Sequence, residues 1–179
     1  MHSMGRDTAI GLLRRSPRAP GPVRQIQVPS TARALCTLSH VDYEDAFLVD
    51  IGSVDDQTPE QWARAILEDA AAATRSALLR GWSALGLRLD PTRSDGFVLG
   101  WEVRCSTPDF VLLGAGSRLG LPAELLFKRQ QKRLLFATFV QQENCIARAV
   151  WAGVEPVHRP IVRDILEQAS CRERRRRQP

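Results

Sequence analysis

Acid–base chemistry in this chain would depend on His158, which stands in the segment Pro156–Pro160. An imidazole titrates near neutral pH, so it can serve as an acid, a base or an anchor for a ligand. No acid or nucleophile stands at a spacing that marks it as the partner of His158. A histidine that packs or forms hydrogen bonds at the start of a helix is the alternative role. His40 lies in an acidic segment, and we expect it to be exposed.

Three further residues are candidates for contact with a ligand. Trp101 and Trp151 are expected on strands, at inward positions, where an indole either fills the core or lines a cavity. Arg118 is expected at the end of a strand, and an arginine that points inward needs an anionic partner from the protein or from a ligand. The candidate ligand-binding residues are therefore Trp101, Arg118, Trp151 and His158, and His158 is also the candidate catalytic residue.

A glycine-rich run from Val111 to Gly120 has Glu143 downstream. Glycines that follow a strand in this way let the backbone approach a pyrophosphate at a helix start, and a later acid can bind a ribose. Pro122 interrupts the helix that this arrangement needs, and too few residues remain for a crossover to a parallel strand. We therefore expect the glycines to bend an antiparallel sheet, and we predict no cofactor.

The four cysteines, Cys36, Cys105, Cys145 and Cys171, are far apart in the chain. Structural zinc sites gather their ligands in pairs at short spacing, and no Cys-x-x-Cys pair occurs here. The sequence therefore predicts no metal site. Because no export signal is recognisable, we expect four reduced thiols and a cytoplasmic protein.

The formal net charge of +5 is unevenly distributed along the chain. Residues 1–33 carry six arginines and one acid, and residues 170–179 carry five arginines and one acid, which gives the ends net charges of +5 and +4. Residues 34–169 carry 14 basic and 18 acidic side chains, a net charge of −4. Nucleic acid is therefore expected as a partner of the ends alone, and no stretch is apolar and long enough to predict a membrane span.

Composition and motifs divide the chain into three expected segments. Residues 1–33 are rich in arginine and proline and lack the apolar core of a secretory signal, which predicts a disordered basic leader. Residues 34–170 are expected to form a single α+β domain. Residues 171–179 are expected to form a disordered arginine-rich tail.

The clearest expected element is a long helix over residues 58–86. It begins with a capping box formed by Thr58 and Gln61, and apolar residues follow at helical spacing as far as Leu85. A short helix is expected from Pro160. Strands are expected before the long helix at 33–39 and 43–51, and after it at 97–105, 109–114, 118–128, 132–142 and 144–154.

The connections between the later strands are short, and short connections join antiparallel neighbours. The fold class predicted is α+β, with a curved antiparallel sheet wrapped around a long helix and a short C-terminal helix. The strand at 132–142 carries apolar residues on both faces, so both faces need a cover. The long helix can cover one face, and a second helix, the leader or the partner subunit of a homodimer can cover the other.

Several motifs resemble a bacterial family known as domain of unknown function 2867. The matching segments are Tyr43–Phe47, Thr58–Ala65, Leu85–Leu87 and, above all, Val154–Val162, which closes in Pro-x-His-Arg. The order of elements is also similar to that of the START-like helix-grip proteins, which include lipid carriers and polyketide cyclases. In those proteins a sheet grips a helix around an apolar cavity. This chain departs from their pattern because its longest expected helix precedes the antiparallel strands.

Three functions are compatible with the sequence. The first is a binding module that holds a small apolar or amphipathic molecule between sheet and helix, near Trp101, Trp151 and His158. The second is an enzyme of the cyclase or hydratase type in the same cavity, with His158 as proton shuttle and Arg118 polarising a carbonyl group. The third is a dimeric interaction protein whose arginine-rich ends bind an acidic partner or nucleic acid.

Overall fold

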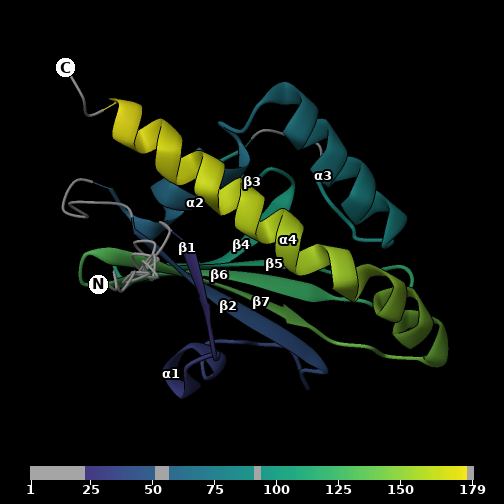
Figure 1. Cartoon of the computed structure of the whole chain (residues 1–179). Coiled ribbons are helices and arrows are strands. Elements are labelled where there is room, and N and C mark those ends of the chain that lie inside the picture. Colours follow the sequence, from purple (N-terminus) through teal and green to yellow (C-terminus); the bar gives the residue numbers. More distant parts are fainter. Residues whose placement is uncertain (1–22, 51–56, 91–93, 177–179) are drawn as a thin grey trace, which may run out of the picture.

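The computed structural model describes residues 23–50, 57–90 and 94–176 of the 179-residue chain (Figure 1). These residues form one antiparallel sheet of seven strands, which has helices on both faces. In chain order the elements are β1 (Val23–Ile26), α1 (Ser30–Arg33), β2 (Tyr43–Asp50), α2 (Pro59–Leu67), α3 (Ala72–Ala84), β3 (Phe97–Val98), β4 (Trp101–Ser106), β5 (Phe110–Ala115), β6 (Ala123–Gln130), β7 (Arg133–Val140) and α4 (Cys145–Arg176).

The strand order across the sheet is β1-β2-β7-β6-β5-β4-β3. Strands β3 to β7 therefore pair with their neighbours in sequence, as the short connections predict, and β2 joins them by pairing with β7. This confirms the α+β class with an antiparallel sheet. The glycine-rich run lies in the antiparallel β5–β6 hairpin and leads into no helix, as expected.

The C-terminal part of the chain differs most from the prediction. Residues 144–154 were expected to form a strand followed by a short helix from Pro160, but Cys145–Arg176 is one helix of 32 residues. The amide of Ala147 donates to Asn144 Oδ1 at 2.8 Å, so the Asn144 side chain caps the first turn of this helix. Buried residues then recur at helical spacing along α4: Ala147, Trp151, Val162, Ile165, Leu166 and Ala169.

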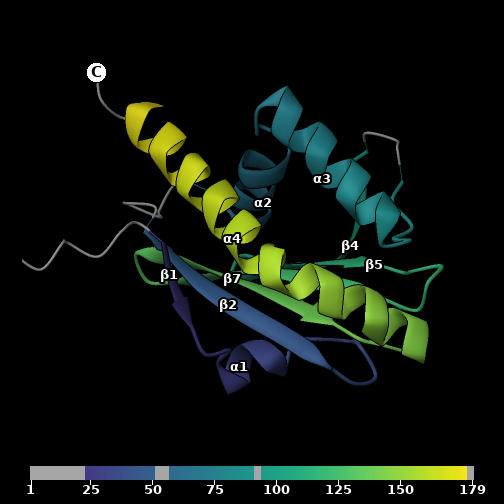
Figure 2. The ribbon, with the colours of Figure 1, turned by 45° about the vertical axis from the view of Figure 1, so that its right-hand side comes forward.

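Two prolines lie inside α4, and they explain the wrong prediction. Pro156 and Pro160 have no amide hydrogen to donate to the carbonyl groups of Ala152 and Pro156, which disfavours a helix through both residues, and the helix was expected to begin only at Pro160. The helix continues instead, and it bends part-way along its length (Figure 2), as a helix does where backbone hydrogen bonds are missing. Contact with the sheet through the buried stripe holds the two halves of α4 in place.

The expected helix over 58–86 is also wrong in its extent, because it divides into α2 and α3. Its capping box is confirmed: the amide of Gln61 donates to Thr58 Oγ1 at 3.2 Å, and the amide of Thr58 donates to Gln61 Oε1 at 2.8 Å. At the break between the two helices, Arg75 donates to the carbonyl groups of Glu68 and Ala70. The helix α2 is anchored in the core through Trp62 and its neighbours, whereas none of the residues of α3 is buried.

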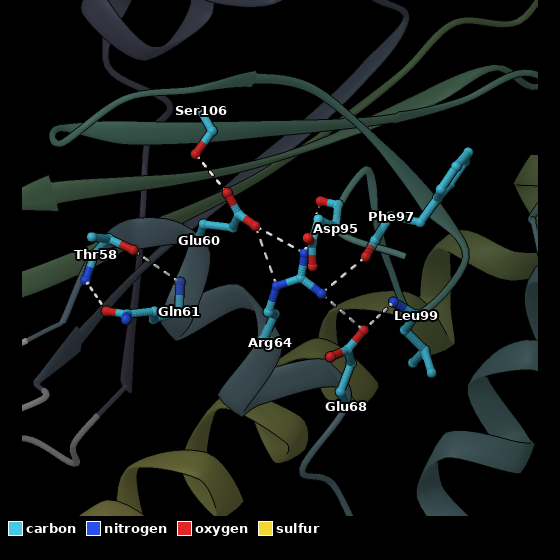
Figure 3. Close-up of polar contacts among 9 residues, drawn as sticks. All are labelled: Thr58, Glu60, Gln61, Arg64, Glu68, Asp95, Phe97, Leu99 and Ser106. Carbon is cyan, nitrogen blue, oxygen red and sulfur yellow. Dashed lines mark hydrogen bonds and ion pairs between the residues drawn. The ribbon is translucent and has the colours of Figure 1, made fainter. Parts of the chain in front are cut away.

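A polar network fastens α2 to the end of the sheet (Figure 3). Arg64 pairs with Glu60 at 2.8 Å and donates to the carbonyl oxygen of Phe97 at 3.0 Å. Glu68 accepts from the amide of Leu99 at 3.0 Å, and Ser106 donates to Glu60 at 2.7 Å. These groups bind one another or the backbone, so the network positions α2.

The face of the sheet opposite α4 is covered by α1 and the segments around it (Figure 1). Residues 23–33 were expected to lie in a disordered leader, but they form β1 and α1. Val23 packs into the core on the α4 side of the sheet, and Ile26, Val28 and Ala32 pack into this second core. The expected tail is also helical as far as Arg176, since α4 continues through it, and residues 1–22 and 177–179 lie outside the described residues. The second face of β7 packs against Ala32 and the partly buried residues Ile26, Val28, Leu35, Leu38 and Val41.

A buried carboxylate fixes this second layer to the sheet. Glu124 on β6 is fully buried, accepts from the amide of Thr37 at 2.8 Å and pairs with Arg104, which also donates to Thr37 Oγ1 at 3.0 Å. The side chain of Arg104 crosses over Gly114, where a Cβ atom would lie 1.9 Å from the Arg104 Nε atom. Gly114 therefore leaves the space that Arg104 needs to reach Glu124.

We expect Gly114→Ala to lower the free energy of unfolding by about 1–3 kcal/mol, because Arg104 must leave Glu124 without its cation in a buried site. Gly81→Ala is the matched control. A Cβ at Gly81 of α3 meets no atom within 4 Å and should raise stability by about 0.5–1 kcal/mol. Chemical denaturation of both variants measures the two effects. Equal stability of Gly114→Ala and the wild type would contradict the role given to this contact.

Candidate functional site

A small cavity of about 70 Å³ lies between the sheet and the helices α2, α3 and α4. Its walls are apolar except at Thr138 and His158 and at the indole nitrogen of Trp82. The residues that line it are Ile66, Leu67, Leu78, Trp82, Leu125, Phe136, Thr138, His158, Ile161, Val162, Ile165 and Leu166. The cavity thus lies where sequence reasoning placed a ligand, between the sheet and a long helix, but that helix is α4.

His158 projects from α4 toward β2 and the cavity. Its side chain is 18% exposed, and its Nε2 atom lies 3.3 Å from Oδ2 of Asp45, without the alignment of a hydrogen bond. The imidazole packs against the rings of Tyr43 and Trp151, with centroids 5.6 and 5.3 Å away. His158 therefore lies in the middle of a long helix and not at a helix start, and it borders both an acid and the cavity.

Asp45 is the buried acid of this cluster, with a side chain only 1% exposed. The Tyr43 hydroxyl donates to Asp45 Oδ2 at 2.7 Å, and Arg159 Nε donates to the Tyr43 oxygen at 3.1 Å. Tyr43 and Asp45 face the same side of β2 because they are two residues apart. Burial, together with the negative charge of Asp45, raises the pKa of the Tyr43 hydroxyl above its ordinary value of 10.0, so Tyr43 stays protonated and remains a donor.

Thr138 lies beside Asp45, because the two residues are opposite each other in the β2–β7 pair. The buried side chains that β2, β5, β6 and β7 direct toward α4 are otherwise apolar, apart from the Tyr43 hydroxyl. Cross-strand neighbours have Cβ atoms roughly 5 Å apart, so the carboxylate and the hydroxyl border one small region. Thr138, Asp45, Tyr43 and His158 thus form one polar cluster, which we call the inner polar cluster. Thr138 and His158 line the cavity, and Asp45 lies next to both of them, opposite Thr138 in the β2–β7 pair and 3.3 Å from His158.

Of the four sequence candidates, His158 alone lines the cavity. Trp151 is on α4 and not on a strand, and it is buried against Tyr43 at a centroid distance of 4.7 Å. Trp101 is on β4 as expected, and its ring meets Trp82, which lines the cavity, edge to face at 5.3 Å. Both tryptophans therefore pack against residues that line the cavity, Trp101 against Trp82 and Trp151 against His158.

Arg118 is placed outside the site. It is exposed in the turn between β5 and β6, where its amide donates to the carbonyl oxygen of Gly86 at 2.8 Å. An exposed arginine needs no anionic partner, and Arg118 does not line the cavity. The turn uses its backbone to hold the end of α3.

Sequence reasoning missed Tyr43, Asp45 and Thr138, although a signal for them exists. Tyr43, Asp45, Phe47 and Val49 alternate on β2, so an acid occupies a position whose neighbours on the same face are core residues. Thr138 interrupts the apolar run of β7 in the same way. A carboxylate in a row of buried positions indicates a paired or functional group.

The polar side chains of the site define the chemistry that is available to it. No group of three or more His, Cys, Asp or Glu side chains in the described ranges is placed to hold a metal ion. The inner polar cluster can exchange protons and hydrogen bonds with a bound molecule, since it combines an imidazole, a carboxylate and two hydroxyl groups.

Comparison with known proteins adds no functional residues. No family model, no curated protein and no solved structure matches the chain. Among the described residues, no helix combines the length and apolar character needed to cross a bilayer. The function must therefore be argued from the geometry of the cavity and its polar groups.

Tyr43 is the only tyrosine of the chain, so its ionisation can be followed by phenolate absorbance. We expect no phenolate signal from the folded protein at pH values just above 10.0, where an unfolded tyrosine ionises. The unfolded state releases this proton first, so stability should fall as the pH rises above 10.0. Tyr43→Phe has no phenol to ionise, so its free energy of unfolding, measured by denaturation over the same pH range, should fall less than that of the wild type. A folded protein that titrates like free tyrosine would contradict the buried contact with Asp45.

Proposed function

We propose that this protein binds a small, mainly apolar molecule in the cavity between the sheet and α4. The observation that carries the proposal is the cavity itself, whose apolar walls meet an incompletely paired polar cluster at Thr138 and His158. Burial of an apolar body supplies affinity, and a few polar groups fix orientation, as in ligand sites generally. The binding module is thus the favoured one of the three functions.

The order of elements supports a helix-grip arrangement for this module. A strand, β2, is followed by two short helices, five antiparallel strands and a long C-terminal helix that lies against the sheet. The sequence suggested a departure from the helix-grip pattern, because its longest expected helix preceded the antiparallel strands. In the described residues the longest helix is α4, which follows these strands, so this departure is absent. We propose on this basis that the sheet grips α4 in the manner of START-like proteins.

The volume of the cavity limits the size of the ligand in this conformation. About 70 Å³ is well below the roughly 300–1,000 Å³ of pockets that enclose drug-sized ligands. It accommodates a group of a few heavy atoms, given that one water needs about 10–15 Å³ on the same measure. A larger ligand requires one wall of the cavity to move. The helix α3 can move most readily, because it has no buried residue, and it contributes Leu78 and Trp82 to the wall.

An enzyme acting in the same cavity is the second candidate. The observation that favours it is Asp45, whose carboxylate lies 3.3 Å from His158 Nε2, so that an acid and an imidazole adjoin at the cavity. His158 is also not engaged in a backbone hydrogen bond among the described contacts, which leaves its nitrogen atoms for proton transfer. The carbonyl-polarising role of Arg118 is dropped from this proposal, because Arg118 lies outside the cavity.

We expect Ile165→Phe to abolish ligand binding by filling the cavity, since Ile165 lines it and is 8% exposed. Ile146→Phe, on the same helix but 62% exposed and away from the cavity, is the matched control. Thermal unfolding is measured with n-butyl, n-hexyl and n-octyl alcohols, amines and acids. A ligand that binds the folded state raises the melting temperature of the wild type and Ile146→Phe but not of Ile165→Phe. Equal shifts in all three proteins, or none, would refute the proposal.

Native mass spectrometry separates the binding module from the enzyme. Wild type and His158→Gln are each purified from the same host and sprayed without denaturation. A binding module should retain the same molecule in both proteins, because the apolar walls are unchanged. If the protein is an enzyme, His158→Gln should retain the unconverted substrate. The mass of this molecule should differ from that of the molecule that the wild type carries or releases. The same molecule at the same occupancy in both would rule out catalysis by His158.

A further inference from the structure

The inner polar cluster is short of hydrogen bonds. Eight buried side-chain polar atoms of the described residues have no partner, and three of them are Asp45 Oδ1, Thr138 Oγ1 and His158 Nε2. A fourth, the indole nitrogen of Trp151, belongs to a ring that touches Tyr43 and His158. Folded proteins pair nearly all of their buried polar groups, so this concentration in one place indicates that a partner is missing.

Glu124 provides an internal comparison, because it is a second buried carboxylate of the same sheet. It lies on the opposite face and accepts from the Thr37 amide, the Thr37 hydroxyl and Arg104. Within the described part of the chain, Asp45 accepts one hydrogen bond, from Tyr43, and its Oδ1 atom has no hydrogen-bond partner. The fold can therefore supply hydrogen-bond donors to both oxygens of a buried carboxylate, as it does for Glu124. From the described residues it supplies a donor to only one oxygen of Asp45.

The chemistry of Asp45 determines what the missing partner carries. An ionised carboxylate only accepts hydrogen bonds, so its free oxygen calls for a donor. The basic side chains near Asp45 do not supply one to this oxygen: Arg159 binds the Tyr43 oxygen, and His158 Nε2 lies 3.3 Å from Oδ2, the oxygen that already accepts from Tyr43. A carboxylate on the ligand would instead face the negative charge of Asp45 at close range in a poorly hydrated site.

The cavity leads from this cluster to the surface along apolar side chains. Thr138 and His158 lie at its polar end, and Ile161 of α4, which is 48% exposed, lies at its rim. Leu79 of α3 and Val157 of α4 are further exposed apolar residues on the two helices that flank the opening. A molecule with a polar inner end and an apolar body matches this order.

We propose that the ligand enters with a hydrogen-bond donor foremost, a hydroxyl or ammonium group, and that Asp45 Oδ1 and Thr138 Oγ1 receive it. The site accordingly selects small apolar alcohols and amines and rejects carboxylic acids of the same shape. This inference rests on the proposed function, since it concerns the ligand class of the same cavity. It also assigns to Asp45 and Thr138 a binding role that the sequence motifs do not indicate.

The test compares n-butanol, n-butylamine and n-butanoate, which share one apolar body. Dissociation constants are measured by calorimetric titration of the full chain at neutral pH. We expect butanol or butylamine to bind at least about tenfold more tightly than butanoate, which is about 1.4 kcal/mol of discrimination. Asp45→Asn should reduce this preference to about threefold or less, because the variant keeps the shape of the side chain and removes its charge. Asp109→Asn, an exposed acid in the turn before β5, should preserve it.

Thr138→Val provides a second variant, because it removes the hydroxyl group with little change of shape. It should weaken butanol at least about threefold and leave butanoate unchanged, as expected for the loss of one hydrogen bond. Butanoate binding to the wild type as tightly as butanol overturns the inference while leaving the proposed function standing. A preference that survives both Asp45→Asn and Thr138→Val overturns it as well. If none of the three compounds binds, but larger apolar molecules stabilise the wild type and not Ile165→Phe, the inference is wrong and the proposed function stands. If no compound binds at all, both the inference and the proposed function are wrong.

Discussion

The strands β6 and β7 carry apolar side chains on both faces, and the rest of the structure depends on covering both. On one face Leu125, Phe127, Leu134 and Phe136 meet α2 and α4, and on the other Leu126 and Leu135 meet the segments around α1. A sheet buried on both sides needs two layers of cover from a chain of modest length. This requirement draws residues 28–41 onto one face and a 32-residue helix onto the other.

Covering both faces also buries two carboxylates of the sheet, and their surroundings differ. Glu124 is enclosed by Arg104 and Thr37 and ties the second layer to the sheet. Asp45 is enclosed by aromatic rings and one tyrosine hydroxyl, with a free oxygen beside Thr138. Because burial of a charge is costly unless hydrogen bonds compensate it, the first arrangement is typical of structural support and the second of a site that meets a ligand.

The helix α4 connects this cluster to the cavity. His158 stands between Pro156 and Pro160, where the helix lacks two of its backbone hydrogen bonds, and the residues on either side of this stretch pack on the sheet. The cavity lies along the same stretch of α4 and extends to α3, the helix with no buried residue. The two less constrained parts of the helical layer, α3 and the proline-containing stretch of α4, therefore both border the cavity.

Local patterns in the sequence were sufficient for the α+β class, the antiparallel order of β3 to β7 and the capping box at Thr58, because each depends on neighbouring residues. They did not decide between strand and helix for residues 144–154, since prolines at 156 and 160 normally end a helix and only packing on the sheet keeps α4 continuous. They also did not reveal the break between α2 and α3. The candidate site was identified at one residue, His158. The pairing of β2 with β7 and the crossing of α4 bring Asp45, Thr138 and His158 together, and contacts so distant in sequence are decided by tertiary packing, to which no local pattern responds.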